Sequence, residues 1–567
     1  MDKSFDFISW CSHFFSLENL KSIFLYNETQ PLIFTQFFFW GFFAVVLLFY
    51  SIVYKKNALR NTFLFVVSLF FYYKTSGLFI SILLFSTILD YYIGNRVYSS
   101  KKELTRKILI TTSVSINLLV LFYFKYAYFF TDSYNAIFSS DMHVFNHFAQ
   151  FTNTLAGTHF TVDKILLPVG ISFYTFQTIS YSIDIYRKQL KPVKNIVDFG
   201  FFVTFFPQLV AGPIVRASEF IPQLYQPYRL TQYNLGLSIF WILKGFIKKV
   251  VIGDYIAVNF IDRVFDSPTM YTGFENLMAL YGYSLQVYAD FSGYTDMAIG
   301  IALLMGFTLP VNFNSPYKAK NVGEFWKRWH MSLSSWLRDY LYIPLGGNRG
   351  GSIGTWVTAT AISLFIILLS GKMMVLYVFI WLALLLVFLA IFIKSFKAWL
   401  TTNINLLITM LLGGLWHGAS WQFVIWGGLN GLGLMVYKQW QKISPYEKYN
   451  NWLGIGFKVF VTLTFISFTR IWFRASTMET TQQILGQIAN NFRFDLIPTI
   501  LYSYKMVFFV TLIGFVIHWL PSKTKSWYQD KFIYSPLGVK VIISVITVIG
   551  VYQAMSSELQ AFIYFQF

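Results

Sequence analysis

The sequence predicts an all-α polytopic membrane protein, and three observations lead to this prediction. The chain has 567 residues, of which 56% are hydrophobic and only 12% charged, with a mean hydropathy of +0.54. Water-soluble domains do not bury so large an apolar fraction. Long apolar runs recur along the chain, and basic residues gather in the segments between them. We therefore expect a chain that crosses a membrane many times.

The chain carries a net charge of +19. In a membrane protein, an excess of Lys and Arg predicts cytoplasmic loops at an anionic lipid surface, so we expect no binding to nucleic acid. The single cysteine, Cys11, excludes an internal disulfide framework and a multi-cysteine metal site. The N-terminal segment 1–24 mixes acidic and aromatic residues and has no cleavage site, which predicts an interfacial helix rather than a removed signal peptide.

The apolar runs provide the predicted crossings. At roughly 20 residues per straight span, they predict about 12 to 14 crossings. The runs are 32–54, 61–93, 108–130, 165–186, 235–261, 276–306, 354–370, 373–393, 403–438, 456–475, 504–520 and 538–555.

Basic segments alternate with these runs and give the predicted orientation. Two other connections, 131–163 and 262–276, are nearly free of Lys and Arg, so we expect them outside the cell and both termini outside as well. We expect the chain in the inner (cytoplasmic) membrane. Because it shows neither a repeat nor a linker, we expect one transmembrane domain over 1–567. The basic segments are 55–60, 95–107, 187–194, 394–397, 438–449 and 521–531.

Two stretches do not have the pattern of plain spans. In 197–216, two prolines and a glycine interrupt an apolar run. In 314–349, charges and tryptophans are too dense for hydrocarbon but follow a helical period. Irregular backbone at membrane depth persists only where protein or water lines it. We therefore expect both stretches to form re-entrant or interfacial helices beside a cavity.

Five of the seven histidines have ordinary explanations. His143 and His147 have a metal-binding spacing, but no third ligand is evident, so we expect a solvated loop and no metal site. His159 lies in the same loop without a partner pattern. His13 belongs to the amphipathic N-terminus, and His518 beside a tryptophan is typical of an interfacial anchor.

His417 is different because it lies in the apolar stretch LLGGLWHGASW (411–421). We expect the helix before it, 403–416, to be roughly 21 Å long, which is too short for a hydrocarbon core of about 30 Å. This places His417 within the membrane, where ionisable groups are functional candidates. Catalysis or transport and a structural hydrogen bond remain open alternatives. If the role is catalytic, a neutral imidazole suits general-base chemistry, with Trp416 and Trp421 excluding water and glycines admitting substrate.

His330 lies in FWKRWHMSLSSWLRDY, on the cytoplasmic side by the charge pattern. If this segment is one helix, Trp326, His330, Ser334 and Arg338 lie along a single face. Polar residues within other spans are interpreted as structural pairs in preference to a proton relay. In particular, Asp290 is one turn from Tyr294. The remaining groups of this kind are Asp90, Lys125, Asp184, Lys244 and Asp296.

Four blocks of residues resemble the membrane-bound O-acyltransferase superfamily, and specifically its bacterial alginate O-acetylation branch. They are PQLVAGPIVR (207–216), NFNSPY (312–317), FWKRWHMSLSSWLRDYLYIPLGGNR (325–349) and LLGGLWHGASW (411–421), within a core of about 165–440.

The resemblance implies a helical fold around a thin central funnel and two functional histidines, which here are His330 and His417. It also implies transfer of an acyl group, most often acetyl, from a cytosolic thioester such as acetyl-CoA to a polysaccharide outside, with a secreted or membrane-anchored SGNH-type partner and no bound cofactor. We expect His417 to act as base at the acceptor hydroxyl, and His330 to position the donor. The expected substrate contacts are Trp416, Gly418, Trp326, Trp329, Asn314, Ser334, Arg338 and Pro213, and Lys327 and Arg328 are also available to a phosphate-bearing donor.

Two alternatives remain open. The first is D-alanyl transfer to teichoic acid from a carrier protein, by a protein of the same superfamily. The second is a lipid or glycan transporter without covalent chemistry. The sequence shows no pair of Gly/Pro-broken helices in matching halves, which is the usual indication of a transporter site.

Overall fold

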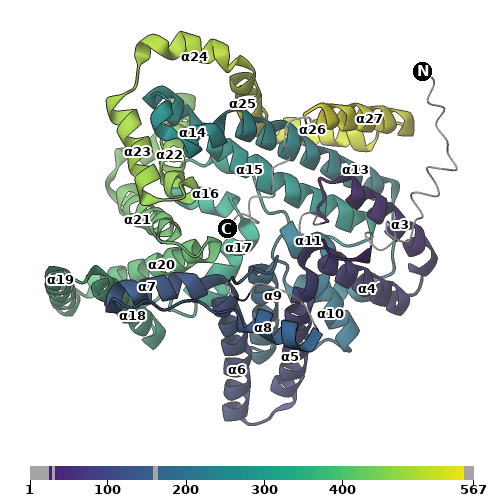
Figure 1. The fold of residues 1–567 in the computed structure, drawn as a ribbon, viewed down its shortest axis with the longest axis horizontal. Coiled ribbons are helices and arrows are strands. Elements are labelled where there is room, and N and C mark those ends of the chain that lie inside the picture. Colours follow the sequence, from purple (N-terminus) through teal and green to yellow (C-terminus); the bar gives the residue numbers. More distant parts are fainter. Residues whose placement is uncertain (1–23, 28–31, 157–161, 163, 555–567) are drawn as a thin grey trace. The chain divides into compact units, whose positions relative to one another are not determined.

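A computed structural model describes residues 24–27, 32–156, 162 and 164–554 (Figure 1). Within these ranges every regular element is helical and no strand occurs. The prediction of an all-α membrane protein is confirmed. The expectations for Cys11, His13 and His159 concern residues outside the described ranges.

The chain divides into two compact units, which are described separately. Unit 1 takes its described residues from 1–121, 167–231 and 301–309, and unit 2 from 122–166, 232–300 and 310–567. The helices of unit 1 are α3 (Phe37–Val53), α4 (Asn57–Ser76), η1 (Gly77–Phe79), α5 (Ile80–Ser99), α6 (Glu103–Leu121), α9 (Ile171–Tyr186), α10 (Ile196–Thr204), α11 (Phe206–Ala211), α12 (Ala217–Phe220) and η3 (Ile221–Tyr225).

A buried carboxylate organises the centre of unit 1, where α5, α6 and α9 pack together. Asp90 on α5 accepts hydrogen bonds from Ser113 and Asn117 on α6, the latter at 2.7 Å, and from Ser182 on α9 at 3.2 Å. Buried polar groups are tolerated when they are hydrogen-bonded in this way. This arrangement explains Asp90 as a structural residue, as the sequence predicts.

The broken stretch 197–216 also belongs to unit 1. It forms α10 and α11, with Pro207 in the first turn of α11, and the chain leaves the helix at Gly212 before Pro213. A Cβ at Gly212 would lie 2.3 Å from the Cα of Gln208, so this exit needs a glycine. The predicted interruption by two prolines and a glycine is therefore confirmed.

Unit 2 holds the remaining elements, including α15, whose end from Ile301 onward counts with unit 1. They are η2 (Phe122–Tyr126), α7 (Ala127–Phe138), α8 (His147–Ala156), α13 (Gln232–Phe246), η4 (Ile247–Asp254), η5 (Ala257–Ile261), α14 (Asp262–Asp266), η6 (Pro268–Met270), α15 (Gly273–Leu304), η7 (Pro316–Lys318), α16 (Val322–Arg328), α17 (Met331–Leu337), η8 (Arg338–Tyr342), α18 (Ile353–Ser370), α19 (Met373–Phe392), α20 (Lys394–His417), α21 (Trp421–Ile443), η9 (Pro445–Lys448), α22 (Trp452–Arg474), α23 (Met478–Asn490), η10 (Phe494–Leu496), α24 (Ile497–Ser503), α25 (Lys505–Trp519), α26 (Ser522–Ile533) and α27 (Leu537–Ala554).

Seven helical segments of the described chain are long and apolar enough to cross a membrane, or eight if the pair around Tyr504, bent by 85°, counts as one. The seven are Asn57–Ser99, Glu103–Phe138, Ile353–Ser370, Met373–Phe392, Ser395–His417, Trp452–Arg474 and Leu537–Ala554.

This number is smaller than the predicted 12 to 14 because several apolar runs form interior helices. The run 276–306 is part of the long helix α15, whose buried polar residues include Asp290 and Asp296. The run 235–261 is divided among α13 and the π-helical turns η4 and η5. An interior helix contacts protein on several sides, so neither span length nor uniform apolarity is required of it.

The carboxylates of α15 form ion pairs with lysines of the α13–η4 segment. Asp290 and Asp254 both pair with the buried Lys249, and the Lys249–Asp254 distance is 2.6 Å. The sequence pointed instead to Tyr294 as the partner of Asp290, since local spacing is visible in a sequence and a contact between distant segments is not. Asp296 pairs with Lys244 and Lys248, at 3.2 and 2.8 Å.

Candidate functional site

His417 is the last residue of α20, where it is only 3% exposed. The expectation of a short preceding helix is wrong, because α20 begins at Lys394 and includes the basic residues that suggested a loop. A helix of 24 residues is about 36 Å long, which is enough to cross a membrane. Helix length therefore does not force the turn at Gly418 into the hydrocarbon, and burial of the side chain by protein is what sets His417 apart.

Aromatic rings enclose the His417 imidazole. The ring centroids of Trp416, Trp426 and Phe473 lie 4.9, 5.1 and 5.4 Å from that of His417, all in edge-to-face orientation. Trp421, the second tryptophan expected at the site, stacks on Phe365 instead. Trp426, further along α21, occupies the position beside His417 that was expected for Trp421. The surroundings are thus apolar and exclude water.

Two consecutive residues satisfy the carbonyl groups at the end of α20. The Lys125 ammonium donates to the carbonyl oxygens of Trp416 and His417, at 2.6 and 3.3 Å, and the Tyr126 hydroxyl donates to that of Leu415 at 3.0 Å. The last carbonyls of a helix lack intrahelical partners and carry a partial negative charge, which a cation stabilises. Lys125, predicted as a structural residue, thereby fixes the backbone that carries His417.

His330 lies at a break in the predicted helix. Helix α16 ends at Arg328, Trp329 is extended, and His330 has φ 43° and ψ 55° before α17 begins at Met331. The left-handed conformation is uncommon outside glycine, although histidine is among the residues that adopt it more often. The single helical stripe expected from Trp326 to Arg338 is therefore wrong: the break redirects the chain at the histidine itself.

Asn312 fixes the proton on the His330 ring. Its Oδ1 accepts from the backbone N–H and the hydroxyl of Ser332, at 3.1 and 2.9 Å, and lies 3.2 Å from Nδ1 of His330. A backbone N–H only donates, so the atom facing it is the amide oxygen, and Nδ1 must carry the proton. This tautomer leaves Nε2 of His330 with a lone pair. Complete burial also lowers the pKa of His330 to about 3, so the ring is neutral near pH 7.

The two histidines come together in unit 2. Their ring centroids are 6.5 Å apart at an interplanar angle of 67°, and the Trp416 ring contacts both. Each ring nitrogen lies less than one bond length from its centroid, so the nearest nitrogens exceed the hydrogen-bond distance of about 3 Å. Two neutral imidazoles in apolar surroundings suit proton transfer to and from a hydroxyl.

Three further predicted residues lie on the segments around the histidines. Trp329 is buried, with its ring 5.0 Å from Phe313. Trp326 contacts the Trp426 ring at 5.7 Å and so lies one residue removed from His417. The Ser334 hydroxyl donates to the carbonyl of Trp329 at 3.3 Å, a contact within its own segment.

Gly418 has a packing explanation in the structure. A Cβ there would lie 2.0 Å from the ring of Phe423, and one at Gly414 would lie 2.3 Å from the Phe423 carbonyl oxygen. These glycines allow α20 and α21 to pack side by side (Figure 1). The space next to each is occupied by Phe423 rather than open to substrate.

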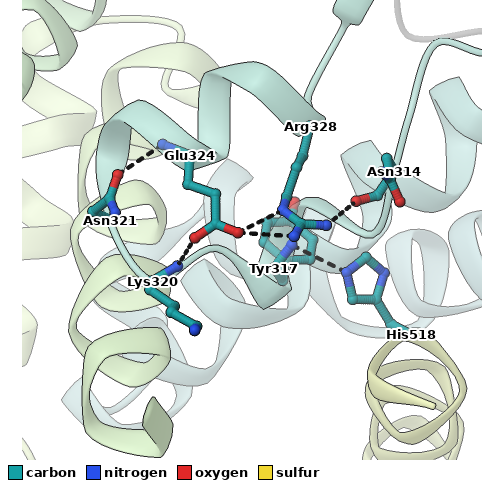
Figure 2. Close-up of polar contacts among 7 residues, drawn as sticks. All are labelled: Asn314, Tyr317, Lys320, Asn321, Glu324, Arg328 and His518. Carbon is teal, nitrogen blue, oxygen red and sulfur yellow. Dashed lines mark hydrogen bonds and ion pairs between the residues drawn. The ribbon is translucent and has the colours of Figure 1, made fainter. Parts of the chain in front are cut away.

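Asn314 and Arg328 belong to a set of hydrogen bonds that fixes the segment before His330 (Figure 2). The Arg328 guanidinium bonds Glu324 at 2.8 Å and donates to the Asn314 carbonyl at 3.0 Å, while the Asn314 N–H donates to the Arg328 carbonyl at 2.9 Å. Asn321 accepts from the Glu324 N–H and caps α16. The Arg328 guanidinium thereby stabilises this segment of the protein.

The other predicted contacts lie apart from this arrangement. Arg338 is largely exposed and pairs with Asp339 at 2.7 Å, and Lys327 is exposed. Pro213 is buried within unit 1. His143 is exposed and lies 3.7 Å from Asp141, and His147 begins α8.

The residues that contact the histidines or their supports and that sequence reasoning missed include Asn312, Trp426, Phe473 and Arg470. The buried Arg470 lies 4.5 Å over the Trp329 ring and donates to the Ser284 carbonyl at 3.1 Å. Asn312 lies in the NFNSPY block, from which Asn314 was the predicted substrate contact. Only tertiary contact distinguishes the two asparagines, and the sequence carried no signal for the other three.

Comparison with known proteins identifies relatives with named activities. Residues 76–403 match the family described as MBOAT, membrane-bound O-acyltransferase family. The chain is 38% identical over 379 residues to the Azotobacter vinelandii protein named "Probable alginate O-acetylase AlgI", a match covering 66% of this chain and 63% of that protein.

Two further relatives are similar over different lengths. The peptidoglycan O-acetyltransferase of Helicobacter pylori is 32% identical over 491 residues, or 81% of this chain and 80% of that protein. The teichoic acid D-alanyltransferase of Bacillus subtilis is 28% identical over 55% of this chain and 69% of that protein. Identity is thus higher to the proteins named for acetyl transfer.

Proposed function

Because this chain belongs to the membrane-bound O-acyltransferase family, we propose that it transfers an acetyl group from a cytosolic thioester, such as acetyl-CoA, to a glycan outside the membrane. The observation that carries the proposal is the meeting of His417 and His330, from two separate sequence blocks, in one buried aromatic cage. The acetyl assignment is supported by the 32–38% identity to relatives named for O-acetylation, compared with 28% for the D-alanyltransferase.

In the proposed reaction, an unprotonated nitrogen of His417 accepts the proton of the acceptor hydroxyl as its oxygen bonds to the acyl carbon. The tetrahedral intermediate then collapses, the C–S bond breaks, and the thiolate takes the proton back from the imidazolium. Positioned proton transfer of this kind typically contributes about 10²–10⁴-fold to the rate. Enclosure by Trp416, Trp426 and Phe473 favours the neutral base and excludes water that would hydrolyse the thioester.

His330 has a supporting role in this proposal. Its Nδ1–H is held by Asn312, so that Nε2 presents a lone pair of fixed orientation. We propose that Nε2 accepts a hydrogen bond from the donor or acceptor and positions it. The predicted substrate contacts Trp326, Trp329, Asn314, Ser334, Arg338 and Pro213 stay part of the proposal.

The setting of the reaction is also proposed. We propose an inner-membrane protein with both termini outside, acting with a secreted or membrane-anchored SGNH-type partner that completes transfer to the polysaccharide. The charge pattern of the connecting segments supports this orientation. The relative named for peptidoglycan matches over four-fifths of both chains, which makes peptidoglycan the first acceptor to test.

The test is replacement of His417 by Ala in the organism that carries the chain. We expect O-acetyl esters on purified cell-wall and exported glycans, measured by NMR, to fall at least about 10²-fold. His143→Ala, at an exposed histidine, is the matched control and should leave acetylation unchanged. Undiminished acetylation in a membrane-inserted His417 variant would refute the assignment. Mass analysis of the esterified group separates acetyl from D-alanyl, and unmodified substrate crossing reconstituted vesicles would indicate a transporter.

A further inference from the structure

A partly open cavity of about 510 Å³ lies in unit 2, and neither His330 nor His417 lines it. Its walls come from α13, η4, α15, the segment 313–315 and the helices α25, α26 and α27. Helices α26 and α27 both pack against α13, and η4 contacts α25 and α27. The volume falls within the range of roughly 300–1,000 Å³ that small-molecule sites occupy.

The cavity carries an excess of positive charge. Lys244 and Lys248 share one carboxylate, Asp296, at 3.2 and 2.8 Å. The third lysine, Lys525, donates to the Ser315 hydroxyl at 2.9 Å and to the His518 carbonyl at 2.7 Å, and it pairs with no carboxylate in the described part of the chain. Three lysine side chains therefore face one carboxylate, and burial lowers the pKa of Lys244 to about 7.

Lys525 still has hydrogen-bonding capacity for an anion. An ammonium has three N–H donors, and two are used. Partial burial and the nearby charges of Lys318 and Lys248 lower the pKa of Lys525 to about 8. A bound anion would offset this repulsion, because an opposite charge favours the protonated ammonium.

His518 adds a second donor to the cavity wall. Its Nε2 accepts the backbone N–H of Tyr317 at 3.0 Å (Figure 2), so the neutral ring carries its proton on Nδ1. The side chain is 3% exposed, and its Nδ1 interacts with the Ser315 backbone without meeting hydrogen-bond geometry. A buried donor without a well-formed hydrogen bond is unfavourable, and an anionic ligand in the cavity would supply an acceptor.

The apolar walls indicate an occupant with a hydrocarbon chain. Ile247, Ile517 and Ile543 line the cavity and are each about two-fifths exposed, so they also belong to the surface of unit 2. Helix α27 is long and apolar enough to cross a membrane, and most of its branched side chains are exposed. The cavity thus opens beside a surface suited to lipid chains.

We propose that this cavity binds the phosphate of an anionic membrane phospholipid, with the lysines around the phosphate and the acyl chains along α25 and α27. Basic pockets between membrane helices recognise lipid head groups by the same combination of charge and apolar wall. The proposal is independent of the acyl-transfer function, since it uses neither histidine of the candidate active site.

Native mass spectrometry of the full chain in detergent tests the proposal. The probes are phosphatidylglycerol, diacylglycerol with the same chains but no phosphate, and inorganic phosphate. We expect retention of phosphatidylglycerol, no retention of diacylglycerol, and no displacement of the lipid by millimolar phosphate. Lys525→Met should weaken phosphatidylglycerol binding about ten-fold, because it removes a charged donor.

Matched variants separate a site from general attraction to a basic surface. Lys523→Met removes an exposed charge from the same helix and should leave affinity unchanged, and Lys525→Arg should retain binding. If Lys525→Met does not yield folded protein, Lys525→Gln takes its place. Equal weakening by the Lys523 and Lys525 variants, or equal retention of both lipids, would overturn the proposal. Displacement by phosphate would overturn the lipid assignment in favour of a soluble phosphate ester.

Discussion

Replacement of Asn312 by Leu tests how far the orientation of His330 contributes to activity. The Asn312 oxygen accepts from Nδ1 of His330 and twice from Ser332. Leu removes this acceptor, leaving the backbone N–H of Ser332 and the imidazole N–H without it. At about 1–3 kcal/mol for each of these two buried donors, we expect a loss of about 2–6 kcal/mol in unfolding free energy.

The variant should also lose activity. Without Asn312, the His330 proton is free to move to Nε2, which removes the lone pair that we propose faces the substrate. Loss of the partner that orients a metal-bound imidazole typically costs about 10–100-fold, and we expect an effect of the same order here. We therefore expect kcat to fall about 10–100-fold in Asn312→Leu, measured with purified, folded protein and a thioester donor.

Two variants complete the experiment. Asn312→Asp keeps an acceptor at the same place and should retain most of the activity; its carboxylate also raises the pKa of His330, shifting the acid limb of the rate profile upward. Asn430→Leu removes an equally buried asparagine that bonds the Trp426 carbonyl on its own helix. It should lower stability without lowering kcat to the same extent. If Asn312→Leu is folded and keeps kcat within about two-fold, the orienting role is refuted.

Three other changes have defined outcomes. Lys125→Met should lower kcat about ten-fold or more and destabilise the protein by about 2 kcal/mol, because it removes the charged donor at the end of α20. Unchanged kcat in the folded variant would contradict a positioning role for Lys125. Gly418→Ala should destabilise the protein by about 2 kcal/mol, because the added Cβ overlaps Phe423. Gly456→Ala, whose added Cβ has no atom within 4 Å, should leave the stability unchanged. Thermal unfolding of both variants measures the difference. The folded-state pKa of His330 is about 3 and the unfolded value about 6.5. The contribution of the neutral ring to stability is therefore complete above pH 6.5 and is lost as the pH falls toward 3. A His330→Gln variant should show a smaller loss of unfolding free energy between pH 6.5 and 4, and an identical loss would argue against the buried neutral ring.

The sequence determined the class of the protein and its two principal histidines. Composition and apolar runs predicted an all-α membrane protein because lipid exposure demands long apolar helices, as in α19, where no residue is buried. Pro207, Gly212 and Pro213 predicted a broken helix because their backbone limits act locally. His330 and His417 stood out because an imidazole among tryptophans and glycines is unusual whatever its contacts.

The tertiary structure decided how many helices meet the span criteria and what surrounds each histidine. Apolar interior helices and lipid-facing helices have similar compositions, so fewer described helices meet the span criteria than the sequence predicted crossings. The helix break at His330, the choice of Asn312 over Asn314, and the place of Trp426 rather than Trp421 beside His417 depend on contacts between distant segments. Residue spacing encodes neighbours within one helix. The partners that set a buried proton or close a helix end, such as Lys125 at α20, are specified only once the helices pack.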